Sequence, residues 1–423
     1  MARALAPQVK LREVWAWSMY DFANSAYTTV VITAVFGAYF VAGIANNAPW
    51  ATFAWTAALS ISYAAILFTG PLVGAWADAH AAKKPLLLAT TIGCVVFTAL
   101  LYVAQPGAVT LALLLIILSN YFFGAGENLI AAFLPELADS RAMGRVSGWG
   151  WSFGYLGGLA ALGICLAYIT SAAAKNVPSS HYVPVTMLIT AAFFAIAATP
   201  TFLFLRERAT PQPRMENPWL RVRETLREAE RYVDLKRFLL CLLFYQAGIT
   251  AVVALAAIYA EQAMKFTMQQ TIMLILVVNV TAAIGAFGFG YLQDALGHVR
   301  AVALTLLGWI VMVLIAGFSH TAVSFWIAAN LAGLCMGSSQ AAGRALVGYL
   351  APPARLAEFF GLWGLAVKAA SIFGPLTYGA VTWIFAGNHR LGIFATGVYF
   401  VIGLVLLRKI DVERGRRSAL ATG

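Results

Sequence analysis

The sequence predicts an all-helical integral membrane protein whose twelve spanning helices form two similar halves of six. Three observations support this class. The 423 residues are 61% hydrophobic and only 11% charged, with a mean hydropathy of +0.80, whereas soluble chains are near 45–50% apolar and about 25% charged. Apolar runs long enough to cross a bilayer recur along the chain, and motifs in its first part return in its second. Soluble enzymes, nucleic-acid binders and disulfide-rich secreted domains are therefore excluded.

Each expected span is an apolar run of roughly 18 residues or more, because about 20 residues at 1.5 Å each cross the hydrocarbon. Unbroken apolar runs such as 111–118 favour helices, which satisfy their own backbone polar groups in lipid. The first run is too long for a signal-peptide core and no cleavage site follows it, so we expect it to be retained. The expected spans cover residues 15–43, 53–77, 85–104, 109–132, 146–170, 184–205, 238–261, 268–293, 301–318, 322–348, 358–385 and 391–408.

The basic residues lie almost entirely on one side of these spans. An even number of spans puts both termini on one side, and all but four of the 28 lysines and arginines fall there; the exceptions are Lys175, Lys265, Lys368 and Arg390. Since positively charged segments stay in the cytoplasm, we expect cytoplasmic termini and a bacterial inner membrane. The net charge of +11 then needs no nucleic acid, and the basic tail is expected to contact anionic lipid.

The longest connection, 206–237, separates an N-terminal half (1–205) from a C-terminal half with a basic tail (238–423). Asn217-Pro218 is typical of a helix start. Apolar residues then follow at helical spacing, which predicts an amphipathic helix on the membrane surface; a solvated charged linker is the alternative. These residues are Trp219, Val222, Leu226, Ala229 and Val233.

The two halves share motifs. A loop with a glycine, an aspartate four residues later and then basic residues follows the second and the eighth expected span. Its residues are Gly74, Asp78, Lys83 and Lys84 in the first half and Gly290, Asp294 and Arg300 in the second. The stretch Gly124–Glu127 also matches Gly337–Gln340, and Tyr155 matches Lys368 at the same offset. Parallel six-helix repeats are a transporter architecture.

The loop motif resembles the signature of the major facilitator superfamily, and longer strings resemble its branch with the autophagy-linked vacuolar amino-acid effluxer and bacterial relatives. The strings are Tyr20-Asp21-Phe22-Ala23-Asn24-Ser25-Ala26-Tyr27, Phe133-Leu134-Pro135-Glu136-Leu137-Ala138, Gly337-x-x-Gln340-Ala341-x-x-Arg344, Glu358-Phe359-Phe360-Gly361, Lys368 and Gly374-Pro375. The resemblance implies the facilitator fold, alternating access and an amino-acid-like substrate. The chain departs from the family pattern at Ala79-His80-Ala81-Ala82-Lys83-Lys84, Ala131 and Tyr245-Gln246-Ala247-Gly248. These departures leave the substrate and the coupling residue open.

Ionisable residues inside spans are candidate functional groups, because each costs at least about 2.5–3.5 kcal/mol to insert. Asp21 heads a polar stripe with Asn24 and Ser25 in the first span, and Glu127 belongs to a similar stripe in the fourth. Two carboxyl groups facing one cavity favour one that keeps its proton, so we expect proton coupling through Asp21 and Glu127. Alternatively, Asp21 only binds backbone amides or Asn24 in a closed bundle.

Lys368 lies about ten residues into its span, near the bilayer midplane. Its expected partner is the substrate or a carboxylate of the first half. With Asp21 and Glu127 in one half and Arg344 and Lys368 in the other, the charges suit a zwitterion. The expected substrate-binding residues are Asn24, Tyr27, Trp151, Tyr155, Tyr245, Gln246, Gln340, Arg344 and Lys368; the aromatic ones can equally be packing residues. The loop motifs Gly74, Asp78, Lys83, Lys84, Gly290, Asp294 and Arg300 are expected to gate the cytoplasmic side.

The expected function is secondary active transport of a small amino-acid-like or zwitterionic solute, by a monomer and without a cofactor. Efflux of amphipathic organic molecules is the main alternative. A copper(I) carrier using Met264 and Met268 is a third reading. An enzyme is disfavoured, since no H-E-x-x-H, Walker or nucleophile-elbow motif occurs. The four cysteines lie in apolar runs and read as small core residues, so we expect no metal.

Overall fold

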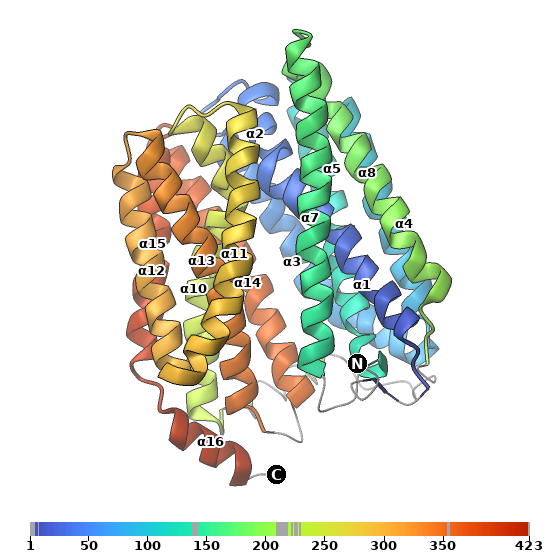
Figure 1. Ribbon diagram of the computed structural model, residues 1–423, viewed down its shortest axis with the longest axis vertical. Coiled ribbons are helices and arrows are strands. Elements are labelled where there is room, and N and C mark those ends of the chain that lie inside the picture. Colours follow the sequence, from blue (N-terminus) through green and yellow to red (C-terminus); the bar gives the residue numbers. More distant parts are fainter. Residues whose placement is uncertain are drawn as a thin grey trace. The chain divides into compact units, whose positions relative to one another are not determined.

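The computed structural model describes residues 5–6, 8–137, 143–208, 219–220, 223, 227, 230–352 and 356–421. These residues are almost entirely helical (Figure 1). Eleven of the helices that they form are long and apolar enough to cross a membrane. A further helix, Leu356–Ile384, has 29 residues and contains Lys368 and Pro375. The predicted all-helical membrane class is therefore confirmed.

The chain divides into two compact units. Unit 1 comprises Met1–Ala51 and Ile61–Pro218, and unit 2 comprises Thr52–Ser60 and Trp219–Gly423. The division after Pro218 falls inside the segment 206–237 that we assigned to the linker. The amphipathic helix expected in that segment lies mostly outside the described residues, although Trp219 and Leu220 are helical and exposed.

Unit 1 is built from the helices of the first six expected spans. Its first span is irregular and the others are single long helices or nearly so. The elements are α1 (Leu11–Ala26), η2 (Tyr27–Ala34), α2 (Phe36–Tyr39), η3 (Phe40–Ile44), α3 (Ala51–His80), α4 (Lys83–Leu100), η4 (Leu101–Val103), α5 (Val109–Ala131), α6 (Leu134–Leu137), α7 (Met143–Ala174) and α8 (Ser179–Phe204). The first three turns of α3, Thr52–Ser60, pack with unit 2, where Phe53 stacks on Trp383.

Unit 2 contains the last six expected spans and a short C-terminal helix. Its elements are α10 (Val233–Gln262), α11 (Met268–Leu296), α12 (His298–Phe318), α13 (Ala322–Leu350), α14 (Leu356–Ile384), α15 (His389–Leu407) and α16 (Val412–Ala421). Polar residues set the helix ends: Thr267 and Gln270 form a capping box at α11, and Asn388 Oδ1 accepts from the first amides of α15. Gly297, with φ of +85°, turns the chain from α11 into α12.

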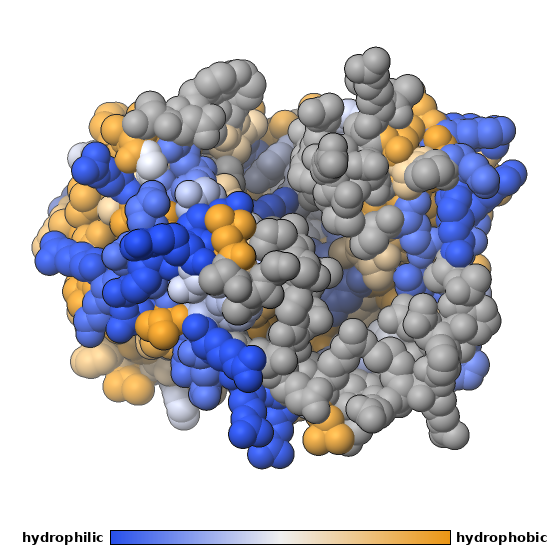
Figure 2. Space-filling model, turned by 90° about the horizontal axis from the view of Figure 1, so that it is seen from below, coloured by the Kyte–Doolittle hydropathy of each residue, from blue (hydrophilic) through white to orange (hydrophobic). Residues whose placement is uncertain are grey.

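The outward faces of the long helices carry large apolar side chains. Ile196 is 74% exposed, Ile384 71% and Phe318 68%, as expected for helices surrounded by lipid. Polar side chains gather instead at the end of unit 2 where α16 lies (Figure 2). Inside the units, aromatic rings fill the spaces between helices. Tyr20 of α1 meets Phe194 of α8 edge to face, with 6.0 Å between the ring centroids.

Candidate functional site

The polar stripe of the first span, which lies on α1, packs against a row of glycines on α7. A Cβ at Gly154 would lie 2.9 Å from Ser25 Oγ, and one at Gly150 would overlap Asp21 Oδ2. At Gly157 the clash would be with the backbone of Phe22 itself. Glycine is the residue that allows such close helix contact. The structure therefore seats the partly buried Asp21 carboxylate directly on the backbone of α7.

Asn24, one turn beyond Asp21, presents a buried acceptor. Its side chain is 6% exposed, and its Oδ1 has no hydrogen-bond partner among the described residues. Leaving such an oxygen unsatisfied costs about 1–3 kcal/mol. An acceptor kept at that cost suits a hydrogen-bond donor from outside the protein.

Tyr20 connects the region of Asp21 with that of Glu127. Its ring is buried, its hydroxyl lies 3.0 Å from Thr91 Oγ1, and a Cβ on Gly126 would lie 2.5 Å from that hydroxyl. Tyr20 precedes Asp21, and Gly126 precedes the partly buried Glu127. Both acids therefore belong to one region of unit 1, where α1 packs on α5.

Helix 1 changes its hydrogen-bond pattern just beyond this stripe. The expected single helix over 15–43 is interrupted by the π-helical segments η2 and η3, with a break at Val35 (φ −121°, ψ −61°). π-Helical turns are rare and are frequently found at functional sites. The sequence contains a feature that indicates this irregularity: residues 28–33 are all β-branched, and such side chains are crowded in an α-helix.

Tyr27 and Tyr245, both expected to bind substrate, are fully buried. The Tyr27 hydroxyl lies 2.8 Å from Ser119 Oγ, and its ring stacks on Phe123 of α5. The Tyr245 hydroxyl is packed against Gly343 of α13. Both rings therefore join helices inside a unit in this structure, and their contact with substrate stays a prediction. Gln246, next to Tyr245, is also buried.

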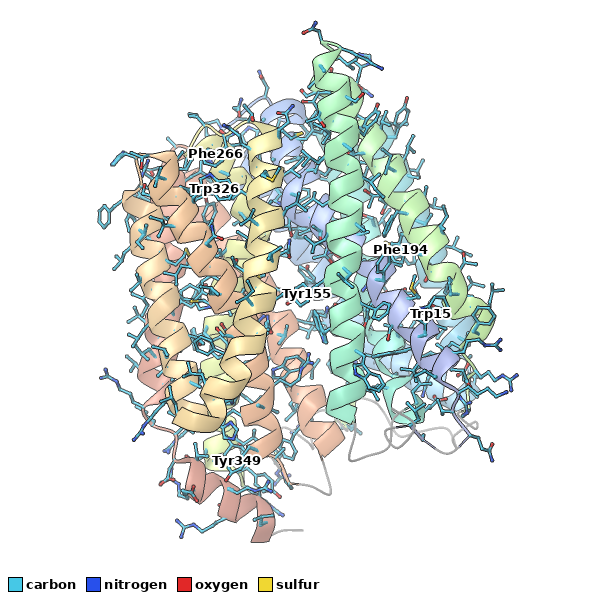
Figure 3. All side chains as sticks on the ribbon, in the orientation of Figure 1. Trp15, Tyr155, Phe194, Phe266, Trp326 and Tyr349 are labelled. Carbon is cyan, nitrogen blue, oxygen red and sulfur yellow. The ribbon has the colours of Figure 1, made fainter. Side chains whose placement is uncertain are left out.

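The other aromatic pair is accessible. Trp151 is 50% exposed, and its ring centroid lies 6.4 Å from that of Tyr155, one turn further along α7. Figure 3 shows Tyr155 projecting from the side of α7. This pair offers an aromatic surface of the kind that an organic solute can contact.

In unit 2 the embedded bases lie on α13 and α14. The Arg344 guanidinium lies 5.4 Å from the ring centroid of Trp363, a cation–π contact that joins the two helices. Gln340, one turn before Arg344, is partly buried. Lys368 is also partly buried, and a Cβ at Gly361 or Gly364 on the preceding turns of α14 would meet nothing within 4 Å. This stretch of α14 therefore borders open space.

The expected gating lysines have partners within unit 1. Lys83 Nζ lies 3.1 Å from Glu136 Oε1. The backbone amides of Lys83 and Lys84 donate to the Glu207 carboxylate, at 2.8 and 3.0 Å, and so complete the N-terminus of α4. A pocket of about 80 Å³ lies beside them, lined by Lys83, Gly74 and Asn128 among others. The side chains of Asp78 and Asp294 and the surroundings of Gly290 lie outside the described part of the chain. Arg300 is exposed, and gating stays a prediction.

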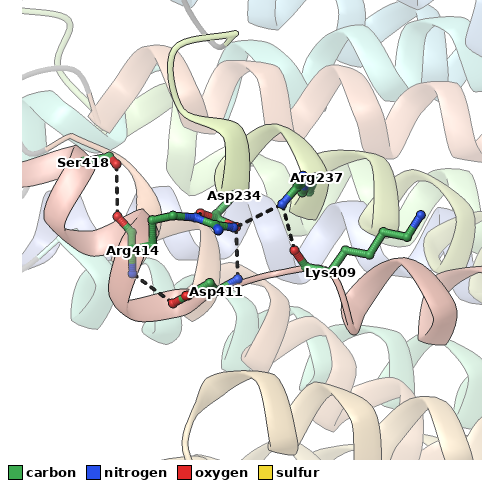
Figure 4. A network of polar contacts seen from close by, with 6 residues as sticks. All are labelled: Asp234, Arg237, Lys409, Asp411, Arg414 and Ser418. Carbon is green, nitrogen blue, oxygen red and sulfur yellow. Dashed lines mark hydrogen bonds and ion pairs between the residues drawn. The ribbon is translucent and has the colours of Figure 1, made fainter.

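The sequence reading missed an ion pair that recurs in both units. In unit 1, Glu13 in the first turn of α1 pairs with Arg208, just after α8, at 2.8 Å. In unit 2, Asp234 in the first turn of α10 pairs with Arg414, after α15, at 2.6 Å (Figure 4). We call these pairs the base clasps. Each one ties the first membrane helix of a unit to the segment after its last. The hydrogen bond to Glu13 raises the pKa of Arg208, and that to Asp234 raises the pKa of Arg414.

Comparison with known proteins gives a family and a set of relatives. The family model described as "Vacuole effluxer Atg22 like" matches residues 50–420. The uncharacterized MFS-type transporter YxiO of Bacillus subtilis (strain 168) is 28% identical over 408 residues, 94% of either chain. Autophagy-related protein 22-1 of Penicillium rubens is 24% identical over 321 residues, which are 69% of this chain. The match covers 53% of that fungal protein, so this chain spans about half its length.

Solved structures of transporters share the fold. The nucleoside transporter NupG superposes with a TM-score of 0.70 at 13% identity, covering 95% of this chain and all of that one. A bacterial homologue of the human lysosomal transporter Spinster gives 0.70 at 13% identity over 97% of both chains. At such low identity these likenesses speak for the fold alone.

Proposed function

This chain belongs to the vacuole effluxer Atg22-like family, and on that premise we propose that it is a secondary active transporter of a small amino-acid-like or zwitterionic solute. It is a membrane transporter of the major facilitator type, and its named relatives are transporters rather than enzymes. The proposal adds alternating access and coupling to protons. It also places the protein in a bacterial inner membrane with both termini in the cytoplasm, for which the distribution of basic residues is the support.

The observation that carries the proposal is the pairing of Asp21 with Asn24 on one face of α1. A carboxylate and an unsatisfied amide oxygen one turn apart are both acceptors, and they suit a substrate ammonium group. Lys368 on α14, beside glycines that border open space, suits the substrate carboxylate. Acceptors and a cation are the two kinds of group that a zwitterion needs, which favours it over a solute with a single charge.

Proton coupling is proposed for Asp21 and Glu127. Tyr20 adjoins Asp21 in sequence and packs on Gly126, so the two carboxyl groups share one region around a buried hydroxyl. A bound substrate ammonium would compete with a proton for these carboxyl groups, so substrate binding and proton release would be linked at this place.

The test uses purified protein in sealed proteoliposomes, labelled amino acids and an imposed pH gradient. We expect uptake that saturates, shows counterflow and increases with the gradient. Asp21→Asn should abolish the stimulation by the gradient, and Lys368→Gln should remove discrimination between an amino acid and its carboxyl amide. Lys265→Gln, which neutralises an exposed loop lysine, is the matched control. Unchanged discrimination in Lys368→Gln would contradict the assigned role of that residue.

A second candidate function is efflux of amphipathic organic molecules. The half-exposed Trp151 beside Tyr155 favours it, because such rings bind apolar solutes without charge selection. The same vesicles loaded with a lipophilic cationic dye separate the two functions. Dye transport that depends on Trp151 and is insensitive to Lys368→Gln would support efflux of amphiphiles.

A further inference from the structure

A cavity of about 280 Å³ opens at the base of unit 2, beside the base clasp of Asp234 and Arg414. It is lined by Arg231, Val233, Asp234, Arg237, Arg414 and Ser418. These residues come from the segment before α10, from its first turns and from α16. None of them belongs to the proposed transport site.

The cavity carries an excess of positive charge. Its one acid, Asp234, is 2% exposed and already holds two hydrogen bonds from the Arg414 guanidinium, at 2.8 and 2.6 Å, and one from the Asp411 amide at 3.0 Å (Figure 4). Three arginines therefore face a single carboxylate whose acceptor capacity is largely used by Arg414 and Asp411.

Two of the arginines retain binding capacity. Arg237 Nη1 lies 3.8 Å from Asp234, and it donates to the Lys409 carbonyl oxygen at 3.0 Å. Arg231 is exposed and forms no ion pair with an acid in the part of the chain that the structure describes. A guanidinium fork with free donors is the group that binds a phosphate through two parallel hydrogen bonds.

The position of the cavity fits a membrane headgroup. The spans on either side of it end at Val233 and Leu407, so it lies where hydrocarbon gives way to headgroups. Val233 is 47% exposed and Leu420 of α16 is 54% exposed, which offers apolar surface beside the arginines. The first amides of α10 also turn the positive end of that helix toward this level.

We propose that this cavity binds a phosphate group, carried by an anionic phospholipid of the adjacent leaflet or by a soluble phosphate. Arg231 and Arg237 are the ligands, and the base clasp holds Arg414 in the wall. The proposal does not depend on the solute that is transported.

The first arm measures lipid binding to the full chain in nanodiscs of phosphatidylcholine containing graded amounts of phosphatidylglycerol. Retained lipid is counted by native mass spectrometry. The double variant Arg231→Gln/Arg237→Gln should weaken phosphatidylglycerol binding by more than about thirty-fold, since each residue loses a direct phosphate contact besides the general attraction of an anionic surface, which is about five-fold per basic residue. Arg408→Gln/Arg417→Gln removes the same charge from exposed positions outside the cavity and should lose only that general attraction, about thirty-fold at most.

The second arm titrates inorganic phosphate into protein in a neutral detergent and follows the heat of binding. Phosphate binding that is lost in Arg231→Gln/Arg237→Gln would support the site and show that a soluble phosphate suffices. Lipid binding without phosphate binding would support a headgroup held together with its acyl chains. Equal losses in both double variants, or no binding in either arm, would overturn the proposal. Both variants keep Asp234 and Arg414, and an unchanged melting temperature checks their folding.

Discussion

Replacing Gly157 by alanine should force α1 away from α7 and lower both stability and transport. The new Cβ would overlap the carbonyl oxygen of Phe22 and would lie 2.7 Å from Phe22 Cα, whereas ordinary contact begins at 3.4 Å, so the helices must separate by more than about 0.7 Å. The neighbour is backbone and cannot rotate aside. Asp21 and Ser25 pack on the same row of glycines, so both would lose their contacts with α7.

The expected magnitude follows from a matched variant. Gly163 lies on the same helix, and a Cβ there would meet nothing within 4 Å. Both alanines gain the same helix propensity, about 1 kcal/mol, so their difference isolates the contact with Phe22. A gap of this size removes about a quarter to a half of the dispersion attraction between α1 and α7. Overpacking of this kind costs about 1–3 kcal/mol. We expect Gly157→Ala to be less stable than Gly163→Ala by about 2 kcal/mol.

The assay is thermal unfolding of both purified variants in one detergent, together with gradient-driven uptake in proteoliposomes. Gly157→Ala should melt several degrees below Gly163→Ala and transport more slowly. Equal melting temperatures and equal uptake of the two variants would refute the reasoning, because the contact between α1 and α7 would then tolerate a side chain that the geometry excludes.

Two further predictions concern the base clasps. Glu13→Gln should lower stability by about 1–2 kcal/mol, discounted for the partial exposure of Arg208, and the double variant Glu13→Gln/Arg208→Gln should lose little more in thermal unfolding. A fully additive loss would mean that the two residues do not act as a pair. Asp234→Asn should release α16, so that limited proteolysis cuts near Arg414 earlier than in the unchanged protein; an identical time course would show that other contacts hold the helix.

The positions of the spans could be predicted because long apolar runs have few alternatives in a membrane. The span expected at 109–132 is α5, Val109–Ala131, and that at 322–348 is α13, Ala322–Leu350. The side of each helix could not be predicted in the same way. In helices that are apolar all round, hydropathy does not show which side of the helix faces the protein interior. Tyr27, in the first span, is buried against α5, whereas Trp151, on α7, is half exposed.

The base clasps were beyond sequence reasoning for a different reason. Glu13 and Arg208 are distant in the chain, and only the folded unit shows that the first and last membrane helices end side by side. In the sequence, the charged residues at the ends of the spans do not differ from ordinary charged residues of a cytoplasmic surface. One sequence feature does mark the acidic partners, because the first helix of each half has an acid in its first turn, Glu13 or Asp234.

The π-helical turns of helix 1 have a mechanical consequence. In η2 each amide bonds to the carbonyl five residues earlier, so a change of this segment to α-helical pairing would rotate everything from Val35 to Ile44 about the helix axis. Asp21, seated on Gly150 before the change of pattern, would keep its place. The change of pattern thus divides the first span into two parts: with such a change of pairing, the part after Val35 would turn while Leu11–Ala26 stayed packed on α7.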